Sequence, residues 1–377
     1  MADVAQRSDE LAAYLALAQV PGIGTARLRT LRSAFDSALS AIQAPHGAIA
    51  ALPGFSRAAA TAIRNVSVRA GREVLAELER LGARVLLPED GDFPALLREI
   101  PDSPPLLYAW GDVSLLARPA AAIVGSRNHT EYGAAAARLL AGGVARRAVV
   151  VSGMARGLDA IAHAAALDAA GGSVGVLGNG FGVIYPAANR ELYERMIAHG
   201  CLITEMPPGE RPHAGAFPRR NRLISGLAAV TVVVEAAPGS GALITVDCAL
   251  DQGRTVLAVP GPITSPTSLG CNRLLQQGAK PALAAADILE ELGMPGFEPG
   301  SPESAARQER RVPPELTGLQ LALWQALERD ARHVDALAAA VGSGRGVATG
   351  DVLTALTELE LRGLVRQEPG MLFALVS

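Results

Sequence analysis

Short runs of β-branched and small apolar residues alternate with longer segments of helical periodicity through the middle of the chain. The apolar runs predict strands at residues 121–125, 148–152, 173–177, 229–235 and 255–259. The intervening segments predict helices over residues 132–146, 158–169, 190–199, 243–252 and 271–278. Runs without polar alternation indicate strands buried on both faces, and strand–helix alternation indicates a parallel, doubly wound sheet. We therefore predict an α/β core.

Helical periodicity also covers residues 1–75, where two similar turns interrupt it, around Pro21–Gly24 and Pro53–Ser56. Each segment reads as helix, Pro-Gly turn, helix, which is typical of a SAM-like or helix-hairpin-helix-like domain whose turn amides can meet a phosphate. Simple chain reversal is the alternative, and we favour it at both turns, more strongly where Ser56 replaces the second glycine. Residues 82–118 contain two more predicted strands that extend or edge the sheet, so the core spans residues 82–293.

The C-terminal part divides into a linker and a small domain. Residues 295–314 are rich in Pro, Gly, Ser and charge, which predicts a flexible linker. Residues 315–377 show three helical patterns and a hairpin, as in a winged-helix domain. From Pro314 onward the chain has five arginines and eight acidic residues, which disfavours DNA groove binding and favours a protein-interaction or vestigial role.

Composition limits the classes of function. The chain has 377 residues, 49% apolar and 19% charged, with a net charge of −3 and a single lysine, so any nucleic-acid contact must come from local arginine clusters. The three cysteines have neither disulfide nor metal-ligand spacing. We find no secretory signal and no apolar stretch of membrane-spanning length, and expect a soluble, cytoplasmic protein.

Arginines occur in three of the five glycine-rich segments that follow or precede the apolar runs. They are Arg127, Arg156 and the group Arg219, Arg220 and Arg222. Ligands collect beyond the carboxyl ends of parallel strands, where amides and helix N-termini attract anions. The segments carry no nucleophile–base pair, no P-loop and no dinucleotide fingerprint, so we predict phosphate binding without catalysis or a cofactor.

Two of these segments have the most specific residue combinations. In VGSRNHTEYG, the amides of Gly125 and Ser126 can face an anion and Arg127 adds a bidentate donor, although an ordinary strand-to-helix turn is an equal alternative. In FPRRNRLISGL, which we predict as a loop just ahead of an apolar helix, Phe217 can stack on a base while the arginines neutralise phosphates. The alternative there is a core phenylalanine with arginines in ion pairs.

A helical pair, Asp159 and His163, has a spacing of four residues and therefore shares one helix face. A catalytic dyad is conceivable, but no candidate nucleophile accompanies the pair. We favour a polar pair that holds the preceding loop.

Taken together, the ordered motifs resemble the DNA-processing protein A (DprA, or Smf) family. The resemblance runs from residue 121 to residue 278 through VGSR, SGMARGLDAIAH, LGNGFGVIYPAANREL, FPRRNR, VVVEAAPGSGALIT, QGRTVLAVPG and GCNRLLQQGA. It implies an extended Rossmann-like core, single-stranded DNA binding in natural transformation, a homodimer, and help in loading the RecA recombinase.

The resemblance also implies roles for individual residues. Gly125, Ser126 and Arg127 would hold phosphate, Phe217 would stack, and the rest of the FPxRNR segment would line the groove, namely Arg219, Arg220, Asn221 and Arg222. Arg156 and the Ser240–Gly241 turn are secondary candidates. One departure is Gly239, which stands where relatives often have a lysine, so one phosphate contact is in doubt.

Two further interpretations stay open. The sheet also looks distantly like LOG-type nucleoside monophosphate phosphoribohydrolases, which would make the protein an enzyme, although only APGSGALIT follows Glu235 here. The predicted helix 285–293 carries Ile288, Leu289 and Leu292, which form either a protein interface, for RecA or a second copy, or ordinary core.

Overall fold

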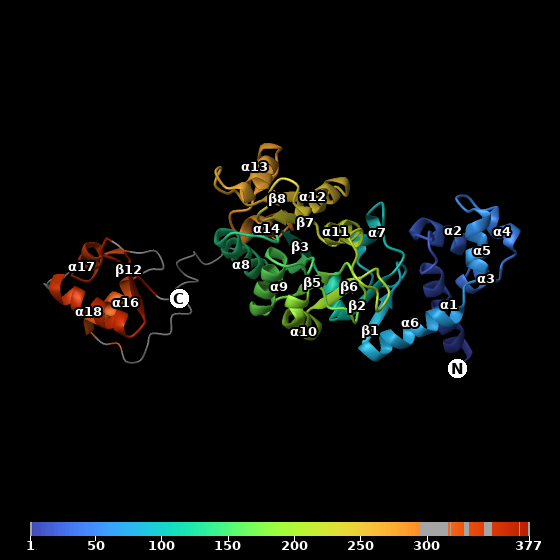
Figure 1. Cartoon of the computed structure of the whole chain (residues 1–377), viewed down its shortest axis with the longest axis horizontal. Coiled ribbons are helices and arrows are strands. Elements are labelled where there is room, and N and C mark those ends of the chain that lie inside the picture. Colours follow the sequence, from blue (N-terminus) through green and yellow to red (C-terminus); the bar gives the residue numbers. More distant parts are fainter. Residues whose placement is uncertain are drawn as a thin grey trace. The chain divides into compact units, whose positions relative to one another are not determined.

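The structure, a computed structural model, describes residues 2–294, 316, 318–327, 332–342, 349–368 and 370–375. The predicted linker, residues 295–314, lies outside the described residues. Contacts group the chain into two compact units, Met1–Pro299 and Gly300–Ser377 (Figure 1). The finer division into four parts stays a prediction.

Six helices precede the sheet, and both predicted Pro-Gly turns connect helices. The six are α1 (Ala2–Ala18), α2 (Thr25–Phe35), α3 (Ala38–Gln43), α4 (His46–Ala50), α5 (Arg57–Arg64) and α6 (Val68–Leu81). Glycine lets α6 lie against α1, because a Cβ at Gly71 would come within 1.8 Å of the Ala12 carbonyl oxygen. The Tyr14 hydroxyl donates a 2.9 Å hydrogen bond to the Pro105 carbonyl, and a shared apolar cluster joins the helices to the core.

Nine strands form one sheet in the order β1-β2-β6-β5-β4-β3-β7-β8-β9. They are β1 (Ala83–Leu86), β2 (Leu107–Gly111), β3 (Ala120–Val124), β4 (Val149–Ser152), β5 (Ser173–Val176), β6 (Cys201–Thr204), β7 (Val230–Val233), β8 (Thr255–Ala258) and β9 (Lys280–Pro281). Strands β3 to β9 pair in parallel, whereas β1 and β2 form an antiparallel edge. The doubly wound α/β prediction is confirmed, with a mixed rather than wholly parallel sheet.

Helices cover both faces of the sheet, because its central strands are apolar on both sides. One face packs on α8 (Glu131–Ala145), α9 (Leu158–Asp168) and α14 (Ala285–Glu291), with α10 (Arg190–His199) beside α9. The other packs on α7 (Ala95–Glu99), α11 (Ala216–Gly226), α12 (Gly241–Asp251) and α13 (Leu269–Gln276). Short 3-10 turns are η1 (Val113–Ala117), η2 (Ala187–Asn189) and η3 (Pro266–Ser268).

The winding direction of the sheet reverses at its first parallel strand. From β3 the chain adds β4, β5 and β6 on one side, and then returns to add β7, β8 and β9 on the other. The loops after β3 and β7 therefore diverge and leave a crevice at the carboxyl ends of these strands. Ligands of open α/β sheets bind at such a switch point.

Three local features differ from the prediction. The FPRRNR segment, predicted as a loop ahead of a helix, lies within α11 itself. Strands β6 and β9 are absent from the prediction. β6 follows the end of α10 after a single residue, so its apolar run merges with the helical pattern, and β9 has only two residues, Lys280 and Pro281.

The prediction of a protein interface at Ile288 and Leu289 is wrong for the folded chain. Both side chains are 0% exposed in the cluster under α8, and Leu292 packs against the same cluster. The physical reason is that the face of the sheet covered by α8 and α9 also has to be covered near β7, and α14 turns its apolar side inward to cover it. The core alternative therefore applies.

The second unit has the elements of a winged helix. Helices α16 (Gly318–Ala326), α17 (Val334–Gly342) and α18 (Thr349–Leu361) surround an apolar cluster that includes Trp324. Strands β10 (Arg332–His333), β11 (Val365–Glu368) and β12 (Leu372–Leu375) form a small sheet in the order β10-β12-β11. Throughout the described part of the chain, the helices are too short or too polar to traverse a bilayer.

Candidate functional site

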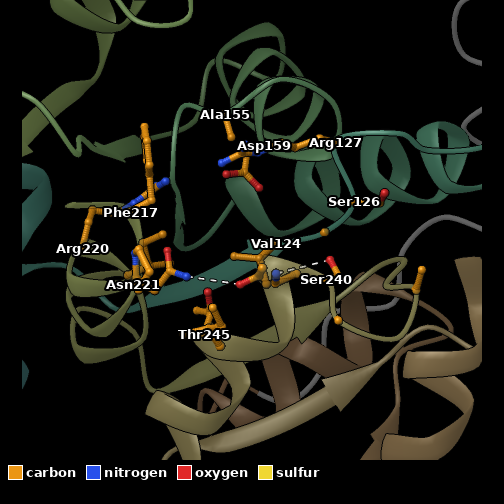
Figure 2. Close-up of a pocket in the computed structure, with 18 of the residues that line it drawn as sticks. Val124, Ser126, Arg127, Ala155, Asp159, Phe217, Arg220, Asn221, Ser240 and Thr245 are labelled. Atoms are coloured by element: carbon orange, nitrogen blue, oxygen red, sulfur yellow. Dashed lines mark hydrogen bonds between the residues drawn. The ribbon is translucent and has the colours of Figure 1, made fainter. Parts of the chain in front are cut away.

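A pocket of about 660 Å³ opens at the switch point between β3 and β7 (Figure 2). Its walls come from the loop after β3, the start of α9, the first turns of α11 and the loop from β7 into α12. The lining includes Gly125, Ser126, Arg127, Asp159, Phe217, Arg220, Asn221, Ser240, Gly241 and Thr245. Most of the predicted site residues are thus brought together from segments distant in sequence.

Hydrogen bonds within the loop after β3 and to the segment after β7 hold that loop in place. The Ser126 amide donates to the Glu235 carbonyl at 2.8 Å, and its hydroxyl donates to the Asn128 carbonyl at 2.7 Å. A Cβ at Gly125 would come within 2.4 Å of the Leu158 side chain, so this position requires glycine. The predicted use of the Ser126 amide for an anion is therefore wrong, because that amide is already bonded.

The Phe217 ring is close to both a cation and a second aromatic ring at the mouth of the pocket. The Arg127 guanidinium lies 5.6 Å from the centroid of the Phe217 ring, and the Tyr185 ring lies 5.5 Å from it on a tilted plane. Arg127 and Tyr185 are exposed, and Phe217 is half-buried. Among the described residues Arg127 has no carboxylate partner. Tyr185 is a site residue that the sequence reasoning missed, although it lies in the motif GVIYP.

A buried guanidinium forms the pocket floor. Arg220 is only 5% exposed, its Nη1 donates to the Val176 carbonyl at 3.1 Å, and its Nε has no partner. The group occupies the space beside Gly153, where a Cβ would come within 1.6 Å of Nη1. Burial lowers the pKa of Arg220, and the nearby Asp159 carboxylate opposes this shift.

Asp159 and His163 hold the loop after β4 in place through hydrogen bonds to its backbone amides. Asp159 Oδ2 accepts from the Gly153 amide at 3.1 Å, and His163 Nε2 accepts from the Met154 amide at 3.3 Å. His163 Nδ1 then donates to the Ser173 hydroxyl at 2.8 Å, which donates to the Val150 carbonyl. The pair thus holds the loop, as the sequence reasoning favoured.

This network makes stability depend on pH. Burial lowers the pKa of His163 to about 3, and the positive charge of Arg220 acts in the same direction. The unfolded chain therefore binds more protons than the folded chain between pH 6.5 and 3, and stability falls with falling pH. Between pH 7 and 5 the loss from this residue is about 2 kcal/mol.

Urea unfolding at pH 7 and pH 5 measures this loss. The His163→Gln variant, which cannot titrate here, is expected to lose about 2 kcal/mol less between the two pH values than the wild type. Equal pH dependence of the two proteins would contradict the assignment.

Arg219 and Arg222 do not line the main pocket. Residues three apart lie on one helix face, so the two project from α11 away from Phe217 and Arg220. Both arginines face Glu205, Arg222 at 2.6 Å and Arg219 at 3.9 Å, and they line a second cleft beside the N-terminal helices. The single arginine groove predicted from the sequence is therefore divided into two surfaces.

Helix α12 begins at the opposite wall of the pocket. Ser240 is its N-cap, and Asn221 Nδ2 donates to the Gly241 carbonyl at 3.2 Å, which ties α11 to α12. An N-terminus attracts anions through its unpaired amides and dipole. Gly239 has φ of 78°, a left-handed conformation that disfavours lysine, so the backbone itself suits the glycine found here.

Two other charged groups lie outside the main pocket. Arg156 is exposed and lines a small adjoining hollow with Arg127, Tyr185 and Phe217. Glu235 is 1% exposed and accepts from the Thr130 amide at 2.9 Å, so it faces the start of α8. Within the described residues, no group of three His, Cys, Asp or Glu side chains is placed to hold a metal ion.

Comparison with known proteins agrees with this architecture. The family model described as DNA recombination-mediator protein A matches residues 84–293, and the DprA winged helix domain model matches residues 307–371. The protein Smf of Synechocystis sp. is 32% identical over 97% of this chain and 98% of its own. The putative DNA processing protein DprA of Mycobacterium tuberculosis is 40% identical over 78% of this chain and 77% of its own.

Solved structures show the same fold. DNA processing protein A from Streptococcus pneumoniae superposes with a TM-score of 0.65 and 32% identity, over 74% of this chain and 97% of that one. The Helicobacter pylori protein, described with a single-stranded DNA binding mode, gives a TM-score of 0.51 and 29% identity, over 56% of this chain and 95% of that one.

Fold and pocket together define a recombination-mediator type of α/β protein with an arginine-lined switch-point pocket and a winged-helix unit. The chain belongs to the DNA-processing protein A (DprA/Smf) family.

Proposed function

We propose that the main pocket binds single-stranded DNA, with one phosphate at Arg127 and one base against the Phe217–Tyr185 pair. The observation that carries this proposal is the exposed Arg127–Phe217–Tyr185 stack beside the unpaired Nε of Arg220. Aromatic faces stack on unpaired bases, and guanidinium groups bind phosphates bidentately. A duplex would hide its base faces from such a stack, so single strands suit the pocket better.

Supporting roles follow from position. Gly125 gives the backbone room for close approach, Ser126 fixes the loop conformation that presents Arg127, and Ser240 and Gly241 offer the N-terminus of α12 to a second phosphate. Asn221 keeps the two walls together, and Arg156 extends the cationic rim. The relative from Helicobacter pylori, with its single-stranded DNA binding mode, supports the same ligand class.

A phosphoribohydrolase is the alternative, and the position of Glu235 argues against it. The carboxylate is occupied by the Thr130 and Thr267 side chains and does not line the pocket. We therefore propose a binding protein without catalysis. Release of free base from nucleoside monophosphates, measured by chromatography, would overturn this part of the proposal.

The proposal extends to RecA and to a homodimer in natural transformation, which the family resemblance supports. A dimer offers two pockets to one strand and gains affinity through avidity. We expect the protein to accelerate ATP hydrolysis by a cognate RecA on single strands coated with single-strand binding protein. The Ile288–Leu289 surface is not part of this proposal, because both side chains are buried.

Fluorescence anisotropy with unstructured oligonucleotides tests DNA binding directly. We expect affinity for single strands to exceed affinity for blunt duplex. We also expect little sequence preference, because the pocket would contact the phosphate backbone and the faces of the bases. The log–log salt slope should be about −0.7 per neutralised phosphate. A flat salt response or a preference for duplex would overturn the assignment.

A further inference from the structure

A second cationic cleft lies between the N-terminal helices and the core. It has a volume of about 550 Å³ and is lined by the first Pro-Gly turn and α2 on one side and by α11 and the segment after α7 on the other. Arginines come from both sides, and the charged lining consists of Arg27, Arg29, Arg219, Arg222 and Asp102. Two parts of the chain separated by almost two hundred residues thus meet in one basic surface.

The turn presents unused backbone donors to this cleft. Gly24 is the N-cap of α2 in an extended conformation, and no side chain caps the helix. Within the described part of the chain, the amides of Thr25 and Ala26, which both line the cleft, donate to no acceptor. The positive end of an eleven-residue helix therefore opens into the cleft.

The arginines are held in place to different degrees. Arg27 Nη1 donates to the Gly22 carbonyl at 2.6 Å and its guanidinium stacks 5.7 Å from the Phe55 ring centroid, which fixes the turn. Arg29 is exposed and has no carboxylate partner among the described residues. Arg219 is 59% exposed and only loosely paired with Glu205.

Arg222 is the most constrained of the four. Its Nη2 binds both Glu205 oxygens, at 2.6 and 2.7 Å, whereas its Nη1 is buried without a partner. Even with Glu205 and Asp102 counted, the four arginines leave the cleft net cationic.

The cleft lies on another side of α11 from the main pocket. Phe217 and Pro218 line the main pocket, and Arg219, the next residue, lines the cleft. A strand that leaves the Phe217 stack reaches the cleft by crossing α11, whose diameter with side chains is about 10–12 Å.

We propose that this cleft is a second binding site for phosphodiester groups, at which the turn amides, Arg29 and Arg219 hold the backbone of a single strand that leaves the main pocket. The inference rests on the proposed function of the main pocket. It extends the proposed DNA-binding surface from the main pocket to a second site that the same strand contacts. Backbone amides and charged side chains carry no base information, so the second site adds affinity and salt dependence without sequence preference.

The test compares short and long oligothymidines of about 4 and 16 nucleotides, which span the site sizes of single-strand binding folds. Arg29→Glu should weaken the long strand about tenfold, because a charge-assisted phosphate contact is lost. It should also reduce the magnitude of the salt slope by about 0.7, and leave the short strand within twofold. Arg69→Glu, at an exposed position on α6, is the matched control and should change neither.

A second variant removes an amide and keeps the side-chain charges. Thr25→Pro deletes one N–H at the first helical position, where proline fits, and the extended Gly24 is compatible with a following proline. It should weaken the long strand a few-fold, with the circular dichroism spectrum unchanged.

Three outcomes would overturn the second site. If both variants bound the long strand with the affinity and salt slope of the wild type, the second site would be overturned. The proposed function of the main pocket would still hold, provided that Arg127→Ala loses binding. Equal losses for short and long strands in Arg29→Glu would show that Arg29 does not act at a separate site. If the wild type bound neither strand, both the cleft and the proposed function would fail.

Discussion

Replacing Arg127 by alanine is expected to lower affinity for single-stranded DNA roughly 10- to 100-fold, because a charge-assisted phosphate hydrogen bond contributes about 1.5–3 kcal/mol. The guanidinium also lies over the Phe217 ring, so its removal takes away a contact that holds in place the ring expected to stack on a base. Among the described residues, the exposed Arg127 side chain makes no hydrogen bond or ion pair, so the unfolding free energy should change little. Anisotropy titration measures the affinity, and urea unfolding checks the fold.

Two further variants make this prediction specific. Arg147→Ala removes an exposed arginine just before β4, at the amino ends of the strands, and should leave affinity unchanged. Arg127→Lys keeps the charge and loses the planar bidentate fork, so it should bind with intermediate affinity. If Arg127→Ala and Arg147→Ala behaved alike, the DNA site would lie elsewhere.

Replacing Asp159 by alanine should destabilise the protein by about 1–3 kcal/mol, because the buried Gly153 amide loses its acceptor beneath the pocket. The buried Arg220 guanidinium also loses the favourable charge of this nearby carboxylate. Burial raises the pKa of Asp159, and Arg220 opposes that shift, so the two groups depend on each other. Urea unfolding at pH 7 measures the loss.

A double-mutant cycle separates this pairing from simple loss of packing. Arg220→Met removes the charge and keeps an unbranched side chain in the same space. The Asp159→Ala/Arg220→Met double variant should be more stable than the sum of the two single losses predicts, since no unpaired charge remains. Additive losses would mean that the two groups are not coupled.

The sheet and the main pocket were largely predictable from local signals. Strands β3, β4, β5, β7 and β8 each carry an apolar run whose ends agree with the prediction to within two residues. The apolar runs of β3 and β4 each end at a glycine-rich turn. Gly125 and Arg127 lie in the turn after β3, and Arg156 lies in the turn after β4. Because parallel strands place their carboxyl ends at one edge, the sequence alone predicts that these turns converge.

The division of the FPRRNR arginines could not be predicted as long as the segment was taken for a loop. A loop imposes no angular relation between successive side chains, whereas α11 rotates them by about 100° per residue. Helical spacing would have separated Phe217 and Arg220 from Arg219 and Arg222. The helical signal was weak, because proline and two adjacent arginines interrupt the apolar pattern.

By itself, the sequence determined the α/β class, the positions of most strands along the chain, the winged-helix elements and the glycine turns that carry arginine. These features depend on residues close together in the chain, so periodicity and turn chemistry reveal them. Tertiary structure alone decided that Ile288 and Leu289 are core residues and that the Glu235 side chain faces away from the pocket. It also decided that Tyr185 contacts Phe217 and that the first Pro-Gly turn lies near α11. Each depends on which distant surface covers or contacts a given face, and a single sequence carries no local signal for that choice.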